Sequence, residues 1–251
     1  MPSVADHIRA VEGPQDDGRD GVAGQDLETL MRAAHVPGVS LAVIKAFKIH
    51  WAKGYGTADV ETRSDVDRET LFQAGSISKP VAAMAVLKAV QDGAFALDED
   101  INTILRSWKL AGGAFTADRP VTPRMLASHT SGLGDGFGFP GYDPCDALPT
   151  EVQILEGQPP SSLGPVRMER PPLSAMKYSG GGSTILQLAL SEAIQRPFPQ
   201  IMRDHVLDPI GMTHSAQISI AVLRATFTVS PRLIRLEESH PPATLPTSAI
   251  R

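Results

Sequence analysis

The chain has 251 residues, 42% of them hydrophobic, and a formal net charge of -5 at pH 7. This length suffices for one substantial core. No basic run is interleaved with aromatic residues, so we expect no nucleic-acid partner. Cys145 is the single cysteine, and the seven histidines show no paired-ligand spacing, so neither a metal site nor another cofactor is expected.

The first third of the chain predicts a polar lead followed by a helix and a hairpin. Residues 1–24 are rich in Asp, Gly and Gln, and we expect them to be disordered. They lack the apolar core of a secretory signal, so we expect a cytoplasmic protein. Apolar periodicity predicts a helix over 25–34 and strands over 39–45 and 48–56, joined by a tight turn. No segment approaches the roughly 20 apolar residues of a membrane span.

A Ser-x-x-Lys pattern at Ser76 and Lys79 carries the strongest chemical signal. Residues 70–74 predict a short strand, and an apolar helical face runs from there to about residue 91. At the helix start the lysine amine can reach the hydroxyl as a base, and unpaired amides favour developing negative charge. Gly75 would permit close backbone approach. The alternative interpretation is a serine cap beside a solvated lysine.

The same pattern recurs at Ser174 and Lys177, between a Pro-Pro pair and a glycine run. No strand enters a helix there, so we interpret this second match as chance. Residues 111–172 are rich in glycine and proline and predict a loop-heavy helical subdomain with one short helix at 122–128. Two more helices are predicted over 183–195 and 198–206.

Taken together, these motifs resemble the superfamily of serine β-lactamases and penicillin-binding proteins, especially class C β-lactamases and family VIII carboxylesterases. The resemblance implies an α/β fold of the α+β type, in which an antiparallel sheet is flanked by helices and a helical subdomain forms the cleft. The landmarks that carry it, in order, are Val36–Val43, Ser76–Lys79, Asp92–Asp100, Met125–Leu133, Tyr178–Gly182 and Leu207–Thr213.

The resemblance also implies roles for individual residues. Ser76 would be the nucleophile, Lys79 the base, and Tyr178 the proton shuttle between them. Gly180 and Gly181 would contact substrate, and Gly180 stands where class C enzymes carry an asparagine that binds a lactam side chain, which favours esters over β-lactams. His129 would form a hydrogen bond that shapes a turn rather than act in catalysis.

The C-terminal part departs from the family pattern. No Lys-Thr-Gly or His-x-Gly triplet follows Ser215, prolines interrupt most of the span, and only residues 218–229 predict a strand. We therefore expect a polar lead at 1–24, a catalytic domain at 25–214 without the family's last sheet strands, and a divergent tail at 215–251.

These observations predict a serine hydrolase that cleaves small esters through an acyl-Ser76 intermediate. The alternative enzymes are a β-lactamase and a D-alanyl-D-alanine peptidase, and the expected partner is a small-molecule ester or β-lactam substrate. A third possibility is an impaired homologue that keeps only a binding cleft, because half of the oxyanion site would be missing with the third motif.

Overall fold

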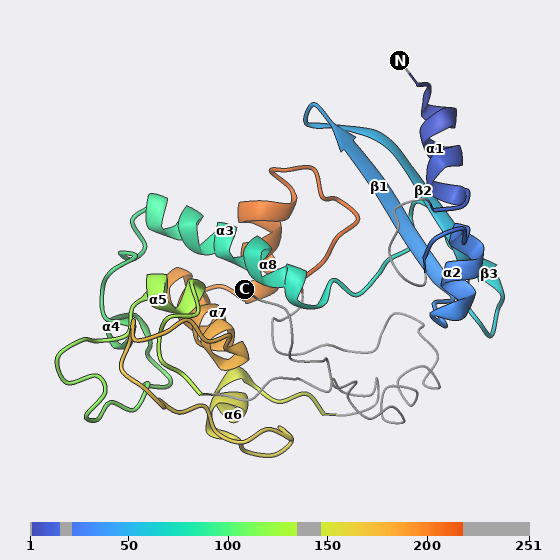
Figure 1. The fold of residues 1–251 in the computed structure, drawn as a ribbon. Helices are drawn as coiled ribbons and strands as arrows, with labels where there is room; N and C mark the ends of the chain where they lie inside the picture. The colour runs from blue at the N-terminus through green and yellow to red at the C-terminus, as the bar shows by residue number, and fades with distance from the viewer. Residues whose placement is uncertain (1, 16–21, 135–146, 218–251) are drawn as a thin grey trace, which may run out of the picture. The chain divides into compact units, whose positions relative to one another are not determined.

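The computed structural model describes residues 2–15, 22–134 and 147–217. They divide into two compact units, one within Met1–Thr70 and the other within Leu71–Thr226. The first unit is a small antiparallel sheet with two helices, and the second is a cluster of helices (Figure 1). Cys145 and the strand predicted at 218–229 lie outside the described residues.

The sheet of the first unit is built on the predicted hairpin. Strand β1 (Gly38–Lys45) pairs antiparallel with β2 (Lys48–Asp59), and a two-residue turn joins them. Ala46 and Phe47 in this turn both have positive φ, 50° and 61°. This conformation matches the right-handed twist of the strands, so the hairpin is confirmed. Strand β3 (Ser64–Asp65) pairs with β2 and is too short to leave a periodic signal in the sequence.

The N-terminal lead is not wholly disordered, and that expectation is corrected. Residues Val4–Glu12 form helix α1, which Ser3 caps in a reciprocal arrangement with Asp6. The segment is mostly polar, so its helical periodicity depends on only a few apolar residues. These are Val4, Ile8 and Val11, which recur on one face. A capping box satisfies two backbone donors at once, which stabilises a short helix that has little apolar surface of its own.

Helix α1 is tied to the sheet by polar side chains. His7 Nδ1 lies 3.3 Å from His50 Nε2, and Glu12 forms an ion pair with Lys53, so α1 runs beside β2 (Figure 1). Helix α2 (Leu27–Ala33) confirms the helix predicted at 25–34.

Two strand glycines make room for the core of the first unit. Trp51 and Val66 are buried there. A Cβ atom at Gly54 would lie 2.3 Å from the carbonyl oxygen of Val66, and one at Gly38 would lie 2.6 Å from a Val66 methyl group. Because no real Cβ tolerates such distances, only glycine lets Val66 pack onto the hairpin.

Helix α7 (Gly180–Ile194) is the central element of the second unit. Its first eleven residues are all buried, so it is enclosed around most of its circumference rather than along one stripe. It contacts the surrounding helices, which are α3 (Ser78–Gln91), α4 (Ile101–Ile104), α5 (Pro123–Ala127), α6 (Glu151–Glu156) and α8 (Phe198–Met202).

The start of α7 differs from the prediction. The sequence predicts a helix from residue 183, whereas α7 begins three residues earlier at Gly180. Ser179 caps it, since its hydroxyl accepts a hydrogen bond of 2.8 Å from the amide of Gly182. Three glycines are poor helix formers, but their burial against neighbouring helices and the cap outweigh that preference.

The other helices predicted within the described residues are confirmed, and one predicted strand there is not. Helices α3 and α5 lie where they were expected, and the helix predicted at 198–206 is α8 followed by a π-helical turn at Arg203–Leu207. The strand predicted at 70–74 is wrong, because these residues are irregular. A strand needs a partner for its backbone groups, and the described residues place none beside it. Over the described ranges, no helix has the length and apolar character needed to cross a membrane.

Candidate active site

Ser76 lies in a tight turn at the entrance to α3. Gly75, Ser76 and Ile77 form a 3₁₀ turn, and α3 continues directly from Ser78. Gly75 has φ of +50° with open space around its Cβ position. Its role is therefore the left-handed backbone conformation, not the close approach that the sequence suggested. Ser76 is exposed, which leaves its hydroxyl accessible to a substrate.

The side chain of Lys79 returns to this serine from one turn along the chain. Its Nζ donates a hydrogen bond of 3.1 Å to Ser76 Oγ. Lys79 is half-buried, and its amine reaches the serine turn. The spacing in the sequence thus produces the contact that nucleophile activation requires.

Tyr178 completes the group from 102 positions farther along the chain. Its phenol oxygen lies 2.5 Å from Ser76 Oγ, and either atom can be the donor. Lys79 Nζ lies 4.9 Å from the centroid of the Tyr178 ring, within the range of a cation–π contact. The tyrosine immediately precedes the capping residue of α7, so the buried helix determines where its backbone lies.

The oxygen atom of Ser76, Oγ, therefore contacts both Lys79 and Tyr178. A hydroxyl with an amine and a phenol both within hydrogen-bonding distance can lose its proton to one of them and regain it later. The serine and lysine were predicted from local spacing. The tyrosine was predicted only by resemblance, since nothing local in Tyr178-Ser179-Gly180 indicates what it contacts. The roles of all three stay predictions.

His129 borders this group. Its Nδ1 accepts a hydrogen bond of 3.3 Å from the Ser179 amide, and its carbonyl accepts one of 2.8 Å from the Lys177 amide. These bonds agree with the expectation of a histidine that shapes a turn. The structure adds a contact that the sequence did not indicate, because the imidazole lies 4.6 Å from the Tyr178 ring, centroid to centroid.

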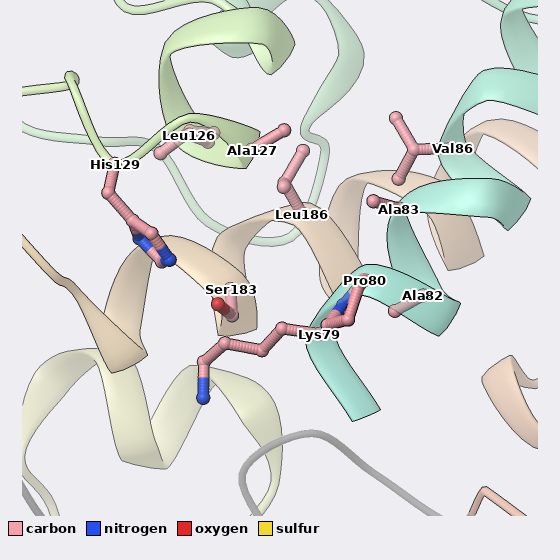
Figure 2. A pocket seen from close by; sticks show the side chains of 10 residues that line it. All are labelled: Lys79, Pro80, Ala82, Ala83, Val86, Leu126, Ala127, His129, Ser183 and Leu186. Carbon is pink, nitrogen blue, oxygen red and sulfur yellow. The ribbon is translucent and has the colours of Figure 1, made fainter. Parts of the chain in front are cut away.

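A pocket of about 170 Å³ opens beside the group (Figure 2). Figure 2 shows the Lys79 amine pointing away from the apolar walls of this pocket. The lining combines three polar side chains with small and branched apolar ones, among them Lys79, His129, Ser183, Val86, Leu126 and Leu186.

The second Ser-x-x-Lys match has a different environment. Lys177 Nζ lies 2.8 Å from a carboxylate oxygen of Glu169, and Ser174 Oγ donates to the carbonyl of Pro171. The hydrogen bond from Lys177 holds the pKa of the Glu169 carboxyl below its ordinary value. Lys177 is thus engaged by a carboxylate, whereas the amine of Lys79 contacts a serine hydroxyl.

Gly180 and Gly181, predicted to bind substrate, form the first turn of α7 and are buried. Their part in substrate binding stays a prediction. Within the described residues, no three His, Cys, Asp or Glu side chains gather closely enough to hold a metal ion.

Comparison with known proteins identifies the family of this chain. A profile of the Beta-lactamase family matches residues 24–233, which is more than half of the chain. The chain belongs to the Beta-lactamase family. The resemblance to serine β-lactamases and penicillin-binding proteins, and the fold class that it implied, are thereby confirmed.

Three proteins illustrate what the chain is similar to. Penicillin-binding protein 4 of Amycolatopsis lactamdurans is 26% identical over 203 residues, which cover 81% of this chain and 50% of that protein. A beta-lactamase/D-alanine carboxypeptidase structure from Yersinia pestis has a TM-score of 0.60 at 24% identity, with 74% of this chain and 51% of that one covered. EstCE1, a hydrolase with promiscuous acyltransferase activity, has a TM-score of 0.59 at 22% identity, with 73% and 49% covered.

The similarity to these two solved structures shows the fold of this chain. The chain spans 36% to 50% of the length of curated relatives that it matches.

Proposed function

We propose that this protein hydrolyses small carboxylic esters through an acyl-Ser76 intermediate. The observation that carries the proposal is the convergence on Ser76 Oγ of Tyr178 OH at 2.5 Å and Lys79 Nζ at 3.1 Å. A serine hydroxyl is a weak nucleophile unless an adjacent base removes its proton, and these two groups are placed to do so.

The reaction would proceed in two balanced halves. In the first, Ser76 Oγ gives its proton to the Lys79–Tyr178 pair and attacks the ester carbonyl carbon. The tetrahedral intermediate then collapses, the alkoxide leaves with a proton from the Tyr178 phenol, and an acyl-serine remains. In the second half, water loses a proton to the same pair, attacks the acyl carbon, and releases the carboxylic acid as Ser76 Oγ regains its proton.

One observation favours esters over β-lactams. Gly180 lacks the amide side chain that class C enzymes carry at this position, so a lactam side chain would lose a hydrogen-bonding partner. The likeness to EstCE1, a hydrolase with promiscuous acyltransferase activity, supports acyl transfer in general. The likenesses to the Yersinia pestis protein and to penicillin-binding protein 4 support a second candidate, a β-lactamase or D-alanyl-D-alanine carboxypeptidase.

Active-site labelling tests the nucleophile. The protein is incubated with a fluorophosphonate probe or a labelled penicillin, and the adduct is located by mass spectrometry. We expect label on Ser76 and none in the Ser76→Ala variant. Ser174→Ala is the matched control, because it removes the serine of the second Ser-x-x-Lys match, and it should label as the unaltered chain does. Label on Ser174, or undiminished label in Ser76→Ala, would contradict the proposal.

A comparison of substrates tests the choice between the two candidates. We expect p-nitrophenyl acetate and butyrate to be cleaved with higher kcat/KM than nitrocefin. A higher value for nitrocefin would reverse the order of the two candidates while leaving the nucleophile in place.

A further inference from the structure

The contact between Tyr178 and Ser76 depends on where a half-buried aromatic ring is held. Tyr178 lies before the first turn of α7, outside the helix, so helical hydrogen bonds do not constrain its side chain. A phenol oxygen at the end of such a ring moves through several ångströms when the ring rotates. Something beside the ring must therefore limit its rotation if the 2.5 Å contact with Ser76 Oγ is to persist.

The Tyr178 ring has a cationic and an aromatic neighbour among the described residues. The Lys79 amine is 4.9 Å from its centroid, and the His129 imidazole is 4.6 Å from it, with the two ring planes inclined by 34°. The tilted contact between flat rings covers more of the tyrosine than a point charge does. His129 also lines the neighbouring pocket together with Lys79 (Figure 2).

His129 is itself fixed at both its backbone and its ring. It has φ of +57°, in the left-handed region that residues other than glycine adopt rarely, histidine, asparagine and aspartate more often than most. Its carbonyl accepts the Lys177 amide, and its Nδ1 accepts the Ser179 amide. These donors are the two neighbours of Tyr178 in the chain. One histidine therefore accepts hydrogen bonds from the backbone on both sides of the tyrosine, while its ring lies against the tyrosine side chain.

The hydrogen bond from Ser179 also determines the tautomer of His129. A ring nitrogen that accepts an amide proton carries no proton itself, so in the neutral imidazole the proton lies on Nε2. The orientation of the ring is thereby constrained, which a purely apolar contact would not achieve.

We propose that His129 is a positioning residue that holds the phenol of Tyr178 on Ser76 Oγ. This inference rests on the proposed ester hydrolysis, in which the phenol moves the proton. It predicts that His129 acts on the reaction only through Tyr178.

The test is a double-mutant cycle in the full 251-residue chain. His129→Asn keeps a residue that tolerates positive φ and removes the ring. We expect kcat for p-nitrophenyl acetate to fall by about 10- to 100-fold, with KM changed by less than about threefold, because a small displacement of a proton-transfer group costs this much. In a Tyr178→Phe background the same change should cost less than about twofold, since the hydroxyl that it positions is absent.

Matched controls separate positioning from folding. His35 also has positive φ, at 55°, is exposed and belongs to the other unit, so His35→Asn makes the same substitution away from the site and should leave kcat unchanged. If His129→Asn lowers the thermal midpoint strongly, His129→Gln replaces it. Gln195 at φ of 59° shows that the chain accepts glutamine in this conformation.

Crystal structures of the unaltered chain and of the variants supply a readout that needs no activity. We expect the separation between Tyr178 OH and Ser76 Oγ to lengthen by about 1 Å or more in His129→Asn and to stay the same in His35→Asn. An unchanged separation, unchanged kcat, or an equal loss of kcat in both backgrounds would overturn the positioning role. Absence of both ester turnover and Ser76 labelling in the unaltered chain would refute the proposed function instead, and the separation alone would then decide the role of His129.

Discussion

Glu192 near the end of α7 offers a test of how the central helix is anchored. Its carboxylate accepts hydrogen bonds from the backbone amides of Arg106 and Ser107, and also from the Ser107 hydroxyl. These bonds tie α7 to the segment that follows α4. Because Tyr178 directly precedes the cap of the same helix, the anchor also supports the position of the candidate site.

Glu192→Gln replaces the carboxylate with an amide that has a single acceptor oxygen. At least one of the three donors then faces an NH₂ group, and the others lose a charged partner. A hydrogen bond to a charged group contributes about 1.5 to 3 kcal/mol. Because Glu192 is only partly buried, we expect the free energy of unfolding to fall by about 1.5 to 3 kcal/mol in total, not by that amount for each bond.

The effect should depend on pH in a direction that the structure determines. Burial raises the pKa of Glu192, but the hydrogen bonds from the Ser107 hydroxyl and from the two amides outweigh burial and leave the pKa below its ordinary value. A lowered pKa in the folded state means that the stabilisation is complete above the unfolded value of about 4.3. It is lost as pH falls through the folded value. The difference between the two proteins should therefore shrink below about pH 4.

Urea unfolding at pH 7 and pH 3 measures this difference. The chain has two tryptophans, Trp51 in the first unit and Trp108 in the second, so a Trp51→Phe background lets Trp108 fluorescence report the second unit alone. Asp204→Asn is the control, since it removes the same charge from an exposed pair with Arg196 and should cost less than about 1 kcal/mol. An equal effect of Glu192→Gln at both pH values would refute the reasoning.

Two further predictions concern backbone strain and the core. Gly75→Ala should lower the free energy of unfolding by about 1 to 2 kcal/mol, because alanine is strained at positive φ, and it should also slow ester hydrolysis. Gly93 also has positive φ, and a Cβ atom there would likewise meet no neighbouring atom. Gly93→Ala should therefore lower the free energy of unfolding by the same amount and leave kcat unchanged. Steady-state kinetics and thermal unfolding of the two variants check this, and equal kinetic losses would contradict a local role for Gly75. Leu190→Ala should lower the free energy of unfolding by about 2 to 5 kcal/mol, because the leucine is fully buried in α7, while Leu87→Ala, 55% exposed, should cost less than about 1 kcal/mol. Comparable losses in urea unfolding would show that α7 is not the core of its unit.

The elements that the sequence determined by itself are those whose signal is local. The turn at Ala46 and Phe47 joins two apolar segments at hairpin spacing. Helix α3 is predicted by an apolar face that ends at a glycine. The spacing of Ser76 and Lys79 is likewise local, because one helical turn brings side chains three positions apart together. Family landmarks added the tyrosine, but only as a likeness.

The tertiary structure decided what depends on distant partners. Helix α7 begins at Gly180, against the helix preference of glycine, because burial and the Ser179 cap outweigh that preference. Residues 70–74 have strand-like composition but no neighbouring strand among the described residues, so they stay irregular. Tyr178 reaches Ser76 across 102 positions, and His129 reaches the tyrosine across 49, through packing around α7. Contacts of this kind depend on how helices pack, and a periodic pattern along one segment carries no information about the segment that will lie against it.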